Sequence, residues 1–166
     1  DAATTGILVL TRNRKAAHYV QSQFANREAQ KTYLVKVEGL PERNAFSVNA
    51  KIDLSVGDSG RRKLSEAGAE AHTDFEVARR YSDGTSLLYA RPLSGRTNQI
   101  RLHLQGCGLP ILGDNAYGAD EDVESGMVAQ ESTLHLHAHA IAFKHPADSK
   151  MVRFESKMPS WADLGE

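Results

Sequence analysis

Two segments with the alternation of β-strands meet at a tight turn, and this pairing is the feature that most constrains the fold. The turn Ser82-Asp83-Gly84 separates residues 71–81 from residues 85–93, and each run is predicted to be a strand of one hairpin. Residues 30–39 show the same alternation and end at a glycine. Because hairpin connections join antiparallel neighbours, the chain is predicted to build a largely antiparallel sheet.

Two helices are predicted beside these strands. The first covers residues 14–28, where apolar side chains recur at helical spacing after Asn13 as the N-cap. The second follows a cap at Ser94 or Thr97, and its apolar face includes Ile100, Leu104 and Cys107. Gly and Pro residues shortly after this face end the second helix.

The remaining segments complete one domain over residues 1–166. Residues 55–70 are polar and rich in Gly, so they are predicted to form a long surface loop. Further strands are predicted over residues 6–10, 46–54, 133–143 and 151–159. Strands with a few interspersed helices and several hairpin connections indicate an α+β fold, with a mixed, mainly antiparallel sheet flanked by helices.

Composition narrows the class of protein. Apolar runs are too short to span a bilayer, and the start shows no signal-peptide pattern, so a protein without membrane attachment is expected. The single cysteine, Cys107, fits a reducing compartment, and the cytoplasm is the expected location. The formal net charge of −1 argues against coating nucleic acid by bulk charge but leaves room for a local basic groove.

Two catalytic patterns can be weighed directly from the residues. His135, His137 and His139 share one face of a predicted strand, and three imidazoles suit an open zinc site. No HExxH or CxxC motif accompanies them, so ordinary hydrogen-bonded histidines are the preferred interpretation and no metal is expected. Cys107 lies on an apolar helix stripe, which predicts a buried structural thiol rather than a nucleophile.

Four motifs in order resemble the RluA-like pseudouridine synthases of ribosomal and transfer RNA. The matching stretches are DAATTG (1–6), KTYLVKVEG (31–39), GRTNQIRLHLQGCGLPILGDNAYG (95–118) and LHLHAHAIAFKHP (134–146). The resemblance implies the pseudouridine synthase catalytic fold and an RNA uridine isomerase. The departures are Thr5 for the usual Ser, Val35 for a small Ala and Asn98 for the commonest His.

The resemblance also implies which residues act. Asp1 stands at the position of the catalytic aspartate, and Arg101 at that of its ion-pair partner. Tyr33 matches the tyrosine that stacks on the uracil and handles the C5 proton. Arg96 and Gln99 are the expected RNA-binding residues. An ionised Asp1 can attack C1′ or remove a 2′ proton, and the resemblance leaves both routes open.

The same resemblance sets the expected partners. The substrate is RNA, ribosomal or transfer, and the target base must leave its stack to react. Isomerisation oxidises nothing and donates no group, so no cofactor is expected, and a monomer is the expected state. Because the sequence starts at the aspartate in the middle of the first motif, the domain is expected to be N-terminally incomplete. Any S4-like RNA-binding domain is expected upstream.

Two alternatives from other classes stay open beside the isomerase. One is a catalytically inactive RNA-binding or chaperone module of the same fold. The presence of Asp1, Tyr33 and Arg101 argues against it. The other is a metal-dependent hydrolase built on the histidine strand.

Overall fold

The computed structural model describes residues 2–55, 61–118 and 133–162. The elements, in chain order, are β1 (Thr5–Gly6), α1 (Arg14–Ala25), β2 (Gln30–Glu38), β3 (Ala45–Asn49), β4 (His72–Arg80), β5 (Thr85–Pro92), α2 (Gln99–Gly106), β6 (Leu136–Lys144) and β7 (Met151–Glu155). Among these residues, no helix is long and apolar enough to cross a membrane.

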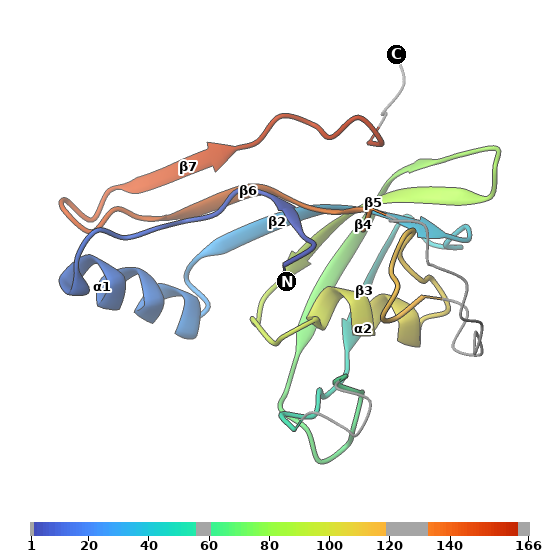
Figure 1. Ribbon diagram of the computed structural model, residues 1–166, viewed down its shortest axis with the longest axis horizontal. Coiled ribbons are helices and arrows are strands. Elements are labelled where there is room, and N and C mark those ends of the chain that lie inside the picture. The colour runs from blue at the N-terminus through green and yellow to red at the C-terminus, as the bar shows by residue number, and fades with distance from the viewer. Residues whose placement is uncertain (1, 56–60, 119–132, 163–166) are drawn as a thin grey trace.

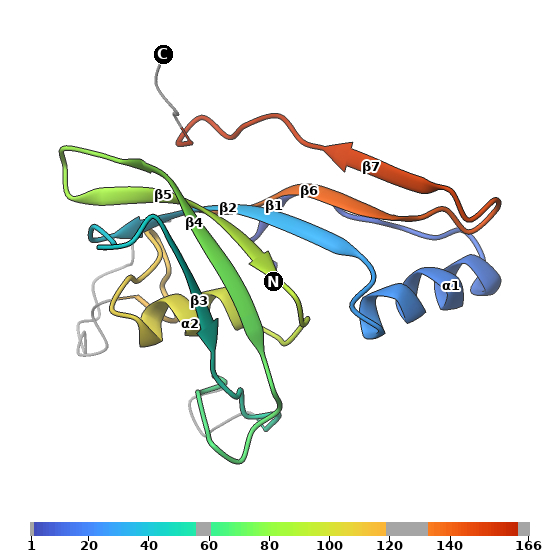
Figure 2. The ribbon, with the colours of Figure 1, turned by 180° about the vertical axis from the view of Figure 1, so that it is seen from behind.

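One mixed sheet of seven strands organises the chain. Its order is β1-β6-β2-β5-β4-β3, and β7 also pairs with β6 (Figures 1 and 2). The β1–β6 pair is parallel and the other pairs are antiparallel. The predicted α+β fold with a mainly antiparallel sheet is therefore confirmed, as is the hairpin of β4 and β5 around residues 82–84.

Both helices lie on the same face of this sheet, at opposite ends (Figure 1). Beneath α2, Ile100 and Leu104 pack on side chains of β2, β4 and β5 in the main core. Beneath α1, Val20 packs on Ile141 and Phe143 of β6 in a separate cluster. Because each helix has its own apolar contact, the sheet between them stays uncovered by either helix.

Helix α1 begins where the sequence predicts. The Oδ1 atom of Asn13 accepts a hydrogen bond from the backbone N–H of Ala16 at 2.9 Å, which satisfies one of the unpaired donors of the first turn. Val20 is buried on the predicted stripe, and Phe24 packs against the same cluster.

The predicted strand over residues 6–10 is wrong beyond Gly6. Strand β2 occupies one edge of β6, so β1 and β7 share the other edge. Strand β7 pairs with β6 from Ala140 onward, which leaves residues after Ile7 no ladder to join. Leu8 and Leu10 are accordingly exposed to 80% and 82%.

The start and end of α2 also differ from prediction. Its N-cap is Asn98, in the left-handed region at φ 57°, and neither Ser94 nor Thr97 caps it. Ser94 is engaged elsewhere, since its hydroxyl donates to Gln99. Cys107 follows the last helical residue, so it leaves the apolar stripe and is exposed rather than buried. The strand predicted over 46–54 is shorter, at Ala45–Asn49.

Candidate functional site

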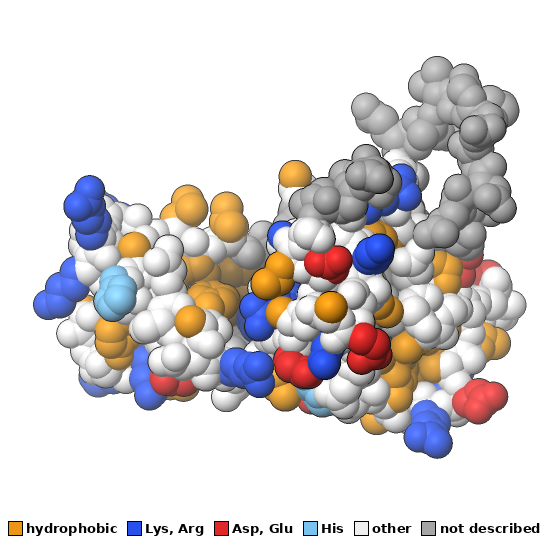
Figure 3. Space-filling view, turned by 90° about the horizontal axis from the view of Figure 1, so that it is seen from below, with side chains coloured by type: hydrophobic (Ala, Val, Ile, Leu, Met, Phe, Trp, Pro, Cys, Tyr) orange, Lys and Arg blue, Asp and Glu red, His pale blue; other side chains and the backbone are white. Residues whose placement is uncertain are grey.

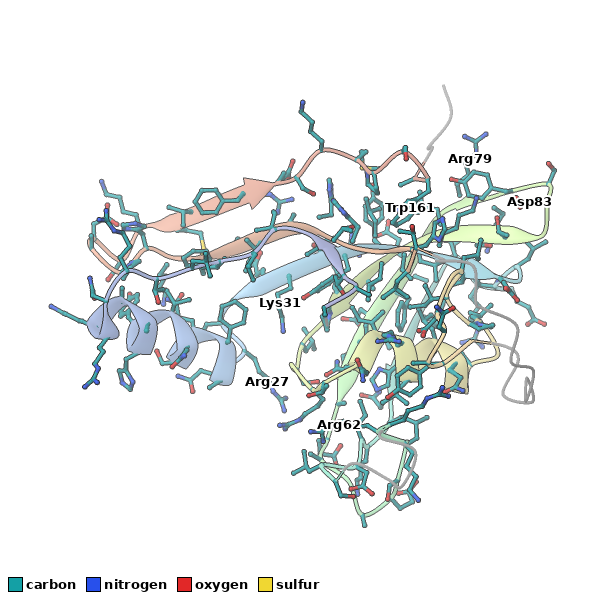
Figure 4. All side chains as sticks on the ribbon, in the orientation of Figure 1. Arg27, Lys31, Arg62, Arg79, Asp83 and Trp161 are labelled. Carbon is teal, nitrogen blue, oxygen red and sulfur yellow. The ribbon has the colours of Figure 1, made fainter. Side chains whose placement is uncertain are left out.

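A cleft of about 730 Å³ opens on the helix-bearing face between the two helices. Five parts of the chain line it: residues from 2–8, Phe24 of α1, Lys31 and Tyr33 of β2, residues from 92–100, and Leu136 and Ala138 of β6. Figure 3 shows the surface of this face hollowed between its two halves, with Lys and Arg side chains beside the hollow. In Figure 4, Arg27, Lys31 and Arg62 lie on this side of the sheet, while Arg79, Asp83 and Trp161 lie on the other.

Strand β2 contributes a cation and a phenol to the cleft. Lys31 and Tyr33 are two residues apart, so their side chains leave the strand on one face. The Lys31 Nζ atom donates to the carbonyl oxygen of Ser94 at 2.8 Å, which links β2 to the loop before α2. Burial lowers the pKa of Lys31 and raises that of Tyr33, so the phenol stays protonated at neutral pH.

The loop before α2 is held by Gln99, which is 4% exposed. Its Oε1 atom accepts from the Ser94 hydroxyl at 2.7 Å and from the Arg96 backbone N–H at 3.0 Å. Its Nε2 atom donates to the carbonyl oxygen of His72 and to the Thr73 hydroxyl. The amide therefore uses both of its atoms within the protein, and the loop presents the exposed Arg96 at the cleft.

Arg101 directly follows Ile100, the last residue of α2 that lines the cleft, and its side chain is 12% exposed. Its guanidinium donates to Asp114 from two nitrogens and to Asn98 from a third. It also lies over the ring of Tyr117, 4.8 Å from the ring centroid. Asn98 lines the cleft, so the Arg101 cluster adjoins the cleft through this residue.

The Asp114 carboxylate is buried and ionised. Burial alone opposes the charge, but the hydrogen bonds from Arg101 and from the N–H groups of Tyr117 and Ala116 outweigh it. The pKa of Asp114 is therefore lowered. This arrangement gives the Arg101 side chain one fixed orientation.

The structure brings together most of the residues that the sequence singles out. Tyr33, Arg96 and Gln99 meet at the cleft, and Arg101 adjoins it. Asp1 lies outside the described residues, while Ala2 and Thr4 line the cleft.

The sequence analysis assigned no role to three residues near the cleft. Lys31 is the first residue of the second motif, and its spacing from Tyr33 was the available signal. Asp114 lies in the third motif, 13 residues after Arg101, and nothing local pairs the two. Thr5 contacts His137, 132 residues away, and no pattern in the sequence predicts that contact.

Packing and hydrogen bonding account for His135 and His137, whereas the buried Nδ1 atom of His139 has no hydrogen-bond partner among the described residues. His137 lies between the hydroxyls of Thr5 and Ser156. His135 packs edge-on against Trp161, with 5.0 Å between ring centroids. Within residues 2–55, 61–118 and 133–162, no three side chains of His, Cys, Asp or Glu gather in a way that could hold a metal ion.

A second hollow, of about 890 Å³, lies between residues 7–15 and β7. Its lining includes the exposed Leu8 and Leu10 together with Phe143 and Phe154. Among the described residues, no phenol lines this hollow, and its one amide side chain is that of Asn13, which caps α1. The polar cleft around Tyr33 is therefore the candidate site.

Comparisons with known proteins agree on one relationship. Residues 1–106 match the family model described as RNA pseudouridylate synthase. The chain is 34% identical to ribosomal large subunit pseudouridine synthase C of Escherichia coli over 163 residues, which is 95% of this chain and 50% of that protein. It is 35% identical to the protein of that name from Haemophilus influenzae, over 95% of this chain and 49% of the relative. The chain thus spans about half the length of these relatives.

Solved structures show the same likeness. Human RNA pseudouridylate synthase domain containing 1 aligns with a TM-score of 0.75 and 25% identity, over 96% of this chain and 66% of that one. Human RNA pseudouridylate synthase domain containing 4 aligns with a TM-score of 0.70 and 24% identity, over 90% and 65%, and shows likeness of fold.

Proposed function

Because this chain belongs to the RNA pseudouridylate synthase family, we propose that it is the catalytic part of an enzyme that isomerises uridine in RNA to pseudouridine. The relatives with which it shares about a third of its residues are named for the large ribosomal subunit, so ribosomal RNA is the proposed substrate. The protein would meet that RNA in the cytoplasm, acting as a monomer. The resemblance to RluA-like enzymes that the motifs predict is confirmed by the family match.

The observation that carries the proposal is the convergence of all four motifs on one cleft. Thr4 and Thr5 come from the first motif, Tyr33 from the second, Arg96 from the third and Leu136 from the fourth. These segments are far apart in the chain, and the fold places them around one volume of about 730 Å³. A cavity of this size suits a single extruded nucleotide.

The reaction breaks the C1′–N1 bond of uridine, forms a C1′–C5 bond, and releases the C5 proton while N1 gains one. Asp1 is proposed to act at the sugar, by attack on C1′ or by removal of a 2′ proton. Arg101 is proposed to pair with that carboxylate and favour its ionised form. Asp114 and Asn98 hold Arg101 in place for this role.

Tyr33 is proposed to stack on the uracil and to handle the C5 proton. Its raised pKa keeps the phenol neutral at pH 7, so the hydroxyl acts as a hydrogen-bonding proton relay rather than as a phenolate. Arg96 is proposed to bind an RNA phosphate. Gln99, buried and engaged within the protein, supports RNA binding by holding the Arg96 loop.

The test uses the full-length protein and RNA labelled with tritium at uridine C5. Release of tritium to water should be seen with large-subunit ribosomal RNA and should vanish in Asp1→Asn. Asp83→Asn is the control, because Asp83 is exposed in the β4–β5 turn on the opposite side of the sheet (Figure 4). Release of tritium from transfer RNA alone would change the proposed substrate from ribosomal RNA to transfer RNA. Binding without release from any cellular RNA would favour the inactive RNA-binding module.

A further inference from the structure

A buried imidazole connects the first motif to the centre of the sheet. His137 of β6 is 7% exposed, and its Nδ1 atom lies 2.7 Å from the Thr5 hydroxyl. Its Nε2 atom lies 2.7 Å from the hydroxyl of Ser156, in the segment that follows β7. One ring therefore joins three separate parts of the chain.

The Ser156 hydroxyl can serve as an acceptor for His137. It lies 3.2 Å from the carbonyl oxygen of His139 and 3.4 Å from that of Ala138, and it can donate its one proton to either. In the tautomer with the proton on Nε2, this hydroxyl accepts from His137. The Nδ1 atom is then the acceptor, and Thr5 donates to it. Burial lowers the pKa of His137, which keeps this neutral form at pH 7.

The contact matters because the first motif is weakly attached by backbone alone. Strand β1 is two residues long, with Thr5 opposite His137 and Gly6 opposite Ala138. The Ile7 N–H donates to the Ala138 carbonyl oxygen at 2.9 Å. A Cβ atom on Gly6 would lie 2.3 Å from that oxygen, so the approach is close enough to require glycine.

We infer that His137 is a positioning residue for the proposed isomerisation, acting through the Thr5 hydroxyl on the segment that begins with Asp1. Thr5 lies four residues after Asp1, and Thr4 and Thr5 line the cleft. A carboxylate that must meet a sugar carbon gains from a support held to a fraction of an ångström. The inference rests on the proposed function.

The Thr5 variants change a single exposed side chain and leave the core intact. Thr5→Val removes the donor to His137 and keeps the shape of an exposed side chain, and Thr5→Ser keeps the donor. Thr11→Val is the matched control, because Thr11 is exposed in the same stretch and lies outside the cleft lining. His137→Gln removes the ring, and its amide can still reach Ser156.

Steady-state tritium release and RNA affinity are measured for each full-length variant. Thr5→Val and His137→Gln should each lower kcat at least tenfold, with KM and the RNA Kd within twofold of wild type. The double variant should be no worse than the poorer single variant, since both remove one contact. Thr5→Ser and Thr11→Val should retain wild-type kcat. An unchanged kcat in Thr5→Val, or losses that multiply in the double variant, would overturn the inference.

Hydrogen exchange separates this inference from the proposed function. The Ile7 amide should exchange faster in Thr5→Val than in Thr11→Val, because the hydroxyl that secures the strand is gone. That readout needs no catalysis. If wild type releases no tritium, the proposed function fails, while the exchange rate still decides whether His137 holds this segment. Equal exchange in the two variants would contradict the inference even in an active enzyme.

Discussion

Arg101 and Asp114 form a two-pronged ion pair, with Nε 2.8 Å from Oδ2 and a terminal guanidinium nitrogen 2.6 Å from Oδ1. The carboxylate side chain is 1% exposed and the guanidinium 12%. The pair connects α2 to the turn that follows Ile111. The third guanidinium nitrogen of Arg101 donates to Asn98 at the cleft. An arginine held in this way presents a fixed charge to whatever enters beside Asn98.

Removing Asp114 should therefore be costly. Asp114→Ala removes the carboxylate that accepts two hydrogen bonds from the largely buried Arg101, so the free energy of unfolding should fall by about 3–5 kcal/mol. Urea denaturation followed by circular dichroism measures this change. Glu155→Ala is the control, because it removes the partner of Arg153 in a pair with both side chains more than half exposed, and should cost at most about 1 kcal/mol. Equal losses would mean that the buried pair is no more important than a surface one.

Tyr33→Phe should separate binding from chemistry. The ring that stacks on the base is kept and the hydroxyl is lost, so kcat for tritium release should fall by about 10²–10⁴-fold. The RNA Kd should stay within about threefold. Tyr89→Phe serves as the control, because Tyr89 packs in the cluster with Leu34 and Leu87 on the other face of the sheet. A kcat near wild type in Tyr33→Phe would remove the phenol from the mechanism.

Arg96→Gln should change the salt dependence of RNA binding. An exposed arginine that neutralises one phosphate contributes about 0.7–0.9 to the slope of log K against log salt. Filter binding at salt concentrations from about 50 to about 300 mM, where log K falls linearly with log salt, measures this slope. Arg153→Gln, which removes the exposed partner of Glu155 on β7, should leave the slope unchanged. A slope that is the same in Arg96→Gln and wild type would place the phosphate contact elsewhere.

His103 should make the fold sensitive to mild acid. Its ring is fully buried between the Thr73 hydroxyl and the Ala50 carbonyl oxygen, and burial lowers its pKa. In the unfolded chain the His103 ring takes up a proton at about pH 6.5, whereas in the folded chain it does so only at a lower pH. Stability should thus be full above that pH and should decline as pH falls toward the folded pKa.

Urea midpoints between about pH 7.5 and 5, a window set by the ordinary histidine pKa, test this expectation. The decline should be smaller in His103→Gln than in wild type. His145→Gln alters an exposed histidine and should keep the wild-type decline. If both variants follow wild type, His103 does not couple folding to protons.

Local patterns predicted the elements whose partners lie nearby in the chain. The β4–β5 hairpin depends on Ser82-Asp83-Gly84, and α1 depends on Asn13 and its apolar stripe. Residues 6–10 have an equally good strand pattern, yet β7 holds the edge of β6 that they would need. Competition for a sheet edge is decided by segments about 140 residues apart, so it leaves no local signal.

The candidate site divides in the same way. The motifs identified Tyr33 and Arg96, because residue type and spacing can be read directly from the sequence. Three other features of the site depend on the order of the strands. Lys31 bonds to Ser94, Gln99 is buried as a support, and Asp114 holds Arg101.

The sequence by itself determined most of the strands, both helices and the family, because these depend on side-chain periodicity, turn residues and ordered motifs. Only the tertiary structure decided which polar groups meet. Thr5 and His137 are 132 residues apart, and a hydrogen bond of 2.7 Å between them exists because β1 and β6 run parallel in one register. Burial then selects each partner, since a polar group removed from water needs a hydrogen bond within the protein.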